Sequence, residues 1–205
     1  MSLDSINSVA PLLTVIIVAA TAIAALVQLK HMRAGNQITA MLSIGEEFSG
    51  KFYADASNLI RDKLSTAMED PVYREYEAAM SAGWQAPQVG PDYVELRRAG
   101  IVVGNAFEEL GILVKRGIID REMFLDRYCW LIYNNWKRME PVTALGRAAL
   151  GNELPWENFE YIAVLSEDWL TKHEKIGTYP HGVRRMELKY PWPLPVAPST
   201  ASASR

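Results

Sequence analysis

An uncharged apolar segment, residues 9–29, constrains this chain more than any other feature of its sequence. It reads VAPLLTVIIVAATAIAALVQL and contains no Asp, Glu, Lys or Arg. At the helical rise of about 1.5 Å per residue, such a segment spans roughly 30 Å, the thickness of the hydrocarbon core of a bilayer. We therefore expect residues 9–29 to form a single transmembrane helix, preceded by a short segment, residues 1–8.

The sequence before this segment argues against a cleaved signal peptide. Signal peptides begin with basic residues and carry a shorter apolar stretch, whereas residues 1–8 include Asp4 and no Lys or Arg. Residues 20–22, Ala-Thr-Ala, do resemble a cleavage site. Cleavage is therefore kept as the alternative to a permanent span.

Basic residues on one side of the segment predict its orientation. Lys30 and Arg33 follow it closely, and no basic residue precedes it. The positive-inside rule then places these two side chains among the cytoplasmic lipid headgroups and the N-terminus outside. We expect the main domain, residues 30–177, on the cytoplasmic side of the membrane.

One side of the predicted span carries polar and small residues. Helices associate in lipid through close packing of small residues and through hydrogen bonds between polar side chains. Three polar residues recur every seven positions, and three alanines lie near them, so the predicted partner-helix contacts are Thr14, Thr21, Gln28, Ala20, Ala24 and Ala25. The alternative is that each threonine hydroxyl bonds to a carbonyl of its own helix.

Amino-acid composition indicates that the main domain is a packed globular domain and limits its partners and cross-links. Apolar residues make up 49% of the chain and charged residues 22%, which is ordinary for a packed globular domain. The formal net charge of −3 gives no basic footprint, so we expect no nucleic acid partner. The single cysteine, Cys129, excludes an intramolecular disulfide and fits a reducing compartment.

Apolar residues after the span recur at intervals of three and four, which predicts helices throughout. No run of alternating β-branched residues is present, so we expect an all-α fold, a helical bundle. The punctuating residues are proline, glycine and aspartate, and they place helices over residues 36–69, 73–80, 91–116, 120–140, 144–150 and 156–173. The first of these either continues from the span or is jointed at Gly35, and Pro141 ends the fourth.

The C-terminal part, residues 178–205, is rich in proline, serine and alanine and is expected to be an extended tail. It nevertheless carries Tyr190, Trp192 and Leu194 beside prolines. These side chains are predicted to contact a neighbouring subunit, and the alternative is a flexible terminus without a partner.

Residues that could support catalysis do not form a recognised pattern. The sequence contains no P-loop, dinucleotide-binding, nucleophile-elbow or zinc-protease motif. Five carboxylates lie near one predicted helix junction: Glu108, Glu109, Asp120, Glu122 and Asp126. We interpret them as a salt-bridging surface. They are also the only residues on which a hydrolase hypothesis could rest. Cys129 is expected to be a buried, unreactive thiol. We expect no enzyme activity, no cofactor and no bound metal.

We interpret four tryptophans at helical positions as core residues and not as a cofactor site. They are Trp130, Trp136, Trp156 and Trp169.

Residues 105–120, NAFEELGILVKRGIID, are followed by Phe-Leu-Asp at 124–126, by Trp136 and by Pro141. Together with residues 156–161 (WENFEY) and 166–170 (SEDWL), this pattern resembles a bacterial family of membrane-anchored helical proteins, domain of unknown function 4760. The resemblance implies an N-terminal transmembrane helix followed by a helical domain. It implies no activity, and the tail lies outside it.

The favoured hypothesis is a non-enzymatic, single-pass subunit that stabilises a larger complex of membrane proteins. The alternative is a membrane-anchored signalling or defence effector that forms a homo-oligomer through its transmembrane helix. A membrane-bound hydrolase that uses the carboxylate cluster is the least favoured hypothesis.

Overall fold

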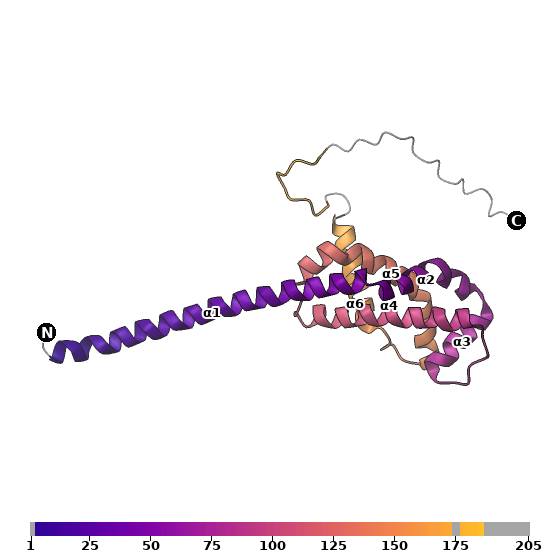
Figure 1. The fold of residues 1–205 in the computed structure, drawn as a ribbon, viewed down its shortest axis with the longest axis horizontal. Helices are drawn as coiled ribbons and strands as arrows, with labels where there is room; N and C mark the ends of the chain where they lie inside the picture. The colour runs from indigo at the N-terminus through magenta and orange to yellow at the C-terminus, as the bar shows by residue number, and fades with distance from the viewer. Residues whose placement is uncertain (1–2, 174–176, 187–205) are drawn as a thin grey trace.

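The computed structural model describes residues 3–173 and 177–186 (Figure 1). Within these residues the chain forms six α-helices and no strand, which confirms the all-α prediction. The helices are α1 (Leu3–Ser49), α2 (Lys51–Glu69), α3 (Pro71–Ala82), α4 (Pro91–Lys115), α5 (Arg121–Leu150) and α6 (Glu157–His173). The predicted tail contacts Tyr190, Trp192 and Leu194 lie outside the described residues and remain predictions.

The first helix is far longer than the predicted span. α1 has 47 residues and runs without a break through Gly35. The chain bends instead at Gly50, which has an extended backbone (φ −62°, ψ 139°) and precedes α2. The predicted single helix over residues 36–69 is therefore wrong. The bend lets Phe48 of α1 and Tyr53 of α2 face each other, with ring centroids 4.7 Å apart.

Pro141 does not end a helix, which is a second correction. α5 continues from Arg121 to Leu150 and includes the segment predicted as a separate short helix. A proline inside a helix removes one backbone hydrogen bond, but Pro141 itself is exposed while Val142 and Thr143 beside it are buried. We infer that packing of these neighbours outweighs the lost bond.

Other helix boundaries follow the local chemistry that predicted them. Pro91 is the first residue of α4, where a missing N–H costs little. The Asp120 side chain accepts a hydrogen bond from the Met123 N–H (2.9 Å) and caps α5. Gly117 and Gly151 each follow a helix with φ of 65°, a left-handed conformation that glycine adopts without strain.

The hydrophobic core lies among α2, α3, α4, α5 and α6. Phe107 of α4 and Phe159 of α6 stack at its centre with ring centroids 4.6 Å apart, and both are fully buried. α1 reaches this core only through its C-terminal part, where Ile44 is 5% exposed and Phe48 packs against Phe107. The rest of α1 projects away from the domain (Figure 1).

Several residues expected in the core are on the surface. Ile38, Leu42 and Phe52 match the helical period but are 57%, 65% and 75% exposed. They are exposed because the bend at Gly50 and the projection of α1 leave no element to cover them. Trp130 is 67% exposed as well, whereas Trp136, Trp156 and Trp169 are partly buried.

Candidate functional site

α1 is, among the described residues, one helix long and apolar enough to cross a membrane. The qualifying stretch is Leu13–Ser49, with a mean hydropathy of 2.1, and none of its most apolar window is buried by the rest of the chain. Signal sequences near an N-terminus meet the same criterion of length and composition. α1 therefore presents an apolar surface that only lipid or another molecule can cover.

The residues predicted to contact a partner helix all lie on this uncovered part of α1. Each is exposed: Thr14, Ala20, Thr21, Ala24, Ala25 and Gln28. The Thr21 hydroxyl donates to the Ile17 carbonyl at 2.8 Å. The hydroxyl proton of Thr21 is thus engaged within its own helix, as the alternative interpretation proposed. Contact with a partner helix remains a prediction.

The exposed row of Thr14, Thr21 and Gln28 along one side of α1, called the stripe below, continues beyond the end of the predicted span. Gly35 and Leu42 continue the seven-residue spacing of Thr14, Thr21 and Gln28, and Ile38 lies between them. A Cβ atom added at Gly35 would meet nothing within 4 Å, and Leu42 is 65% exposed. Sequence reasoning missed this extension because it assigned Ile38 and Leu42 to the core, although the spacing itself was visible.

Arg33, predicted as a lipid headgroup contact with Lys30, also contacts the helical domain. Both side chains are exposed, and the Arg33 Nη2 donates to the Gly117 carbonyl at 3.4 Å. Gly117 lies in the connection between α4 and α5, 84 residues further along the chain. No local pattern could have predicted that these residues meet.

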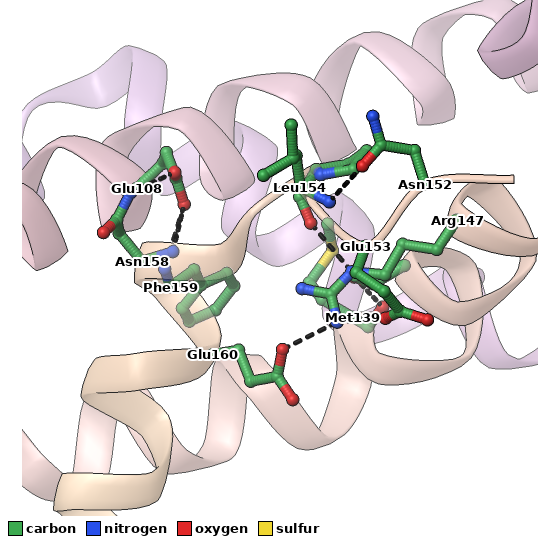
Figure 2. A network of polar contacts seen from close by, with 11 residues as sticks. Glu108, Met139, Arg147, Asn152, Glu153, Leu154, Asn158, Phe159 and Glu160 are labelled. Carbon is green, nitrogen blue, oxygen red and sulfur yellow. Dashed lines mark hydrogen bonds and ion pairs between the residues drawn. The ribbon is translucent and has the colours of Figure 1, made fainter. Parts of the chain in front are cut away.

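A glutamate on α4 organises the start of α6 (Figure 2). The Glu108 carboxylate accepts hydrogen bonds from the backbone N–H groups of Asn158 and Phe159 at 2.9 and 3.0 Å, and from the Asn158 side chain at 2.6 Å. The first N–H groups of a helix lack partners within it and carry partial positive charge. Glu108 therefore caps α6 and does not belong to a salt-bridging surface, which corrects one part of the predicted acidic cluster.

The remaining carboxylates of that cluster do not form a metal site. Asp120 caps α5, while Glu109, Glu122 and Asp126 are exposed. Over residues 3–173 and 177–186, no group of three or more His, Cys, Asp or Glu side chains is placed to hold a metal ion. The cluster thus serves helix capping at two of its five positions.

Arg147 near the end of α5 holds the connection to α6 (Figure 2). Its guanidinium donates to the Pro155 carbonyl at 3.0 Å and to the Glu160 carboxylate at 2.6 Å. Trp156 in this connection has a φ of 54°, which is uncommon for a residue other than glycine. The arrangement fixes the angle at which α6 enters the core.

A buried ion pair connects α3 to α4. The Arg97 Nη1 donates to the Glu77 Oε1 at 2.6 Å, and Glu77 is 4% exposed. Burial raises the pKa of Glu77, while the charge of Arg97 and the hydroxyl of Tyr73 oppose that rise. Both residues line a cavity of about 230 Å³ that Thr143 and Trp156 also line.

A hollow of the described part of the chain lies between α2 and α4. Its volume is about 820 Å³, and its lining combines apolar side chains such as Phe52 and Ile101 with charges of both signs. The lining includes no His, Cys, Ser or Thr.

Cys129 is buried, as predicted, and burial raises the pKa of its thiol. A thiol with a raised pKa is a poor nucleophile, because the thiolate is the reactive form. The ring of His173 bonds to the Trp169 carbonyl at 2.7 Å within α6, while His31 and His181 are exposed.

Comparison with known proteins places the chain in a family without a known activity. A family model, Domain of unknown function (DUF4760), matches residues 15–169. Neither the curated proteins nor the solved structures contain a significant match. The matched segment begins within the apolar part of α1 and ends in α6, so it covers the helical core and the exposed stripe except for Thr14. The chain therefore belongs to the DUF4760 family.

Proposed function

We propose that this protein is a single-pass, non-enzymatic membrane subunit that binds other membrane protein subunits along α1. In this proposal residues 9–29 cross the inner membrane, the N-terminus is outside and the helical domain is cytoplasmic. The observation that carries the proposal is the continuation of the α1 stripe beyond Lys30 and Arg33 as exposed Ile38 and Leu42.

Lipid explains exposed apolar residues only inside the bilayer. Residues 9–29 fill the hydrocarbon core when they span it, so Ile38 and Leu42 lie outside the core, in an aqueous environment. Fully burying an aliphatic side chain of this size contributes about 1.5–3 kcal/mol. In this proposal a protein partner that follows α1 out of the membrane buries both side chains.

The domain does not compete for this face of α1. Successive residues of an α-helix are about 100° apart, which places Gly35 and Leu42 about 120–180° from Ile44 and Phe48, with Ile38 between the two sides. Ile44 and Phe48 pack into the core. The stripe is therefore accessible while the domain stays folded on α1.

The favoured partner is a helix of another membrane protein. A second copy of this chain is the alternative, and the seven-residue spacing is compatible with it, because helices that supercoil around one another repeat their contacts every seven residues. In that case the protein acts as a signalling or defence effector that oligomerises through α1. The net charge of −3 supports neither a nucleic acid nor another polyanion as the main partner.

Substitution of one exposed residue on the stripe tests the proposal. Leu42→Glu places a charge within the stripe, whereas Ser43→Glu places the same charge on the next residue, also exposed and about 100° away. Both variants are extracted with a mild detergent from membranes of the source organism and analysed by native mass spectrometry.

We expect the wild-type protein and Ser43→Glu to co-purify with a stoichiometric partner that Leu42→Glu loses. A partner of the same mass as the chain would select the homo-oligomer. A monomeric wild-type protein, or equal losses in both variants, would refute binding through this face.

A further inference from the structure

We propose that the connection between α4 and α5, residues 116–120, together with Arg121 is a second membrane contact that binds anionic lipid headgroups beside α1. This inference goes beyond a partner on the stripe, because it assigns a lipid-binding role to a segment of the domain itself. It rests on the span of residues 9–29, which the experiment below tests separately.

The fold places this connection next to the end of the span. α4 ends and α5 begins on the side of the domain from which α1 projects (Figure 1). Arg33 lies four residues beyond Leu29, which is about 6 Å along a helix, and the headgroup region extends roughly 5–8 Å beyond the hydrocarbon core. Since Arg33 donates to the Gly117 carbonyl at 3.4 Å, the connection lies at or just outside headgroup level.

The connection has a rigid backbone that turns an apolar side chain outward. The N–H groups of Gly117 and Ile118 donate to the carbonyls of Val114 and Leu113, both at 3.0 Å, which closes α4 in a Schellman motif. Ile119 is 1% exposed and anchors the turn in the core, whereas Ile118 is 54% exposed. Ile118 is thus held at the surface and can enter the interface between headgroups and acyl chains.

Basic side chains surround this isoleucine. Arg116 and Arg121 are exposed on either side of it, and Lys30 and Arg33 on α1 add two further positive charges. The carboxylates of Asp120 and Glu122 oppose them: Asp120 accepts a hydrogen bond from the Met123 N–H as the cap of α5, and Glu122 is exposed. Arginines beside an exposed aliphatic residue are typical of segments that bind anionic bilayers, since each basic residue is attracted by the negative surface potential.

A second contact would set the rotation of the domain around α1. A single helix leaves the domain free to rotate about the helix axis, whereas contact at Gly117 as well as α1 selects one orientation. In that orientation Ile38 and Leu42 point away from the α4–α5 connection. The exposed stripe would then face neighbouring proteins in a defined direction.

A fluorescent label that responds to polarity tests this contact in the full-length chain. Each labelled variant carries Cys129→Ala and one new cysteine: Ile118→Cys at the connection, Ala22→Cys inside the span, and Gln88→Cys before α4. α4 has 25 residues and is therefore about 37 Å long, so Gln88 lies at the end of α4 remote from the connection. The variants are labelled with nitrobenzoxadiazole (NBD) and placed in nanodiscs of phosphatidylcholine with or without phosphatidylglycerol.

We expect NBD at position 118 to shift to the blue and to be quenched by nitroxide-labelled lipid in discs that contain phosphatidylglycerol. Arg116→Glu with Arg121→Glu should abolish both effects, while position 88 should report water throughout. Quenching by lipid separates this contact from burial by protein.

Water-like emission at position 118 in both lipid compositions, with position 22 quenched, would overturn the contact while leaving the span intact. Equal quenching at position 118 with and without phosphatidylglycerol would overturn the selection of anionic lipid. Water-like emission at position 22 would overturn the span on which the contact depends.

Discussion

Two glycines on α4, Gly100 and Gly111, are predicted to respond to substitution by alanine with opposite signs. Glycine inside a helix is destabilising by about 0.5–1 kcal/mol relative to alanine. A Cβ at Gly100 would lie 3.7 Å from the Met139 methyl group, an ordinary contact, so Gly100→Ala should stabilise the fold by about that amount. A Cβ at Gly111 would lie 2.2 Å from the backbone carbonyl oxygen of Asn158.

The carbonyl cannot move away from Gly111 without disturbing the start of α6. It must withdraw by about 1 Å to restore an ordinary contact, yet Glu108 holds the Asn158 and Phe159 N–H groups at 2.9 and 3.0 Å. Overpacking of this kind costs about 1–3 kcal/mol, which exceeds the gain in helix propensity. Gly111→Ala should therefore be destabilising.

Thermal unfolding of the full-length protein in detergent, followed by circular dichroism, measures both effects. A change of 1 kcal/mol shifts Tm by about 2–4 °C in a protein of this size. We expect Gly100→Ala to raise Tm by a few degrees and Gly111→Ala to lower it by several. Equal shifts in the same direction would refute the close approach of α6 to α4.

Three further substitutions test the framework that carries the site. In urea unfolding, Glu108→Gln should lower the free energy of unfolding by about 1–2 kcal/mol, because it removes a charged cap of α6. The control Glu109→Gln changes the exposed neighbouring residue and should alter the free energy of unfolding by less than about 0.5 kcal/mol. Burial raises the pKa of Glu77 above its ordinary 4.5, so the folded state holds this proton more tightly than the unfolded chain. The contribution of Glu77 to the free energy of unfolding should therefore fall as pH rises from 4.5 through the raised pKa. This fall should be absent in Glu77→Gln. Pro141→Ala should restore one helical hydrogen bond and stabilise α5 by about 1 kcal/mol or more, and an unchanged or lower Tm would contradict this.

The sequence predicted those parts of the fold that local chemistry decides. Pro91, Gly117 and Asp120 mark helix ends through a missing N–H, a left-handed backbone and a side-chain cap, and the structure has all three where expected. The apolar length of residues 9–29 likewise decides by itself that α1 is long enough to cross a membrane.

The helix boundaries that were predicted wrongly depend on contacts between distant residues. Local sequence does not distinguish Gly35 from Gly50 as the bend, whereas in the structure Phe48, two residues before Gly50, packs against Phe107 and Tyr128. Pro141 stays inside α5 because its neighbours are buried.

For the same reason, the candidate site was predicted only over residues 14–33. Thr14, Thr21 and Gln28 follow from their spacing. That Ile38 and Leu42 are exposed, and that Arg33 meets Gly117, follows from how α1 leaves the domain. Helical periodicity predicts that a helix has an apolar face, but it does not predict whether another element covers that face.

Site-specific photo-crosslinking on α1 tests the central claim most directly. Benzoylphenylalanine is incorporated at Leu42 or, as the matched control, at Ser43, in cells of the source organism, and the membranes are irradiated. Binding along the stripe predicts one discrete adduct from position 42, of another membrane protein or of a second copy of the chain, and little from position 43. Absence of any adduct at position 42, or equal adducts at both positions, would contradict the claim that α1 holds a partner on this face.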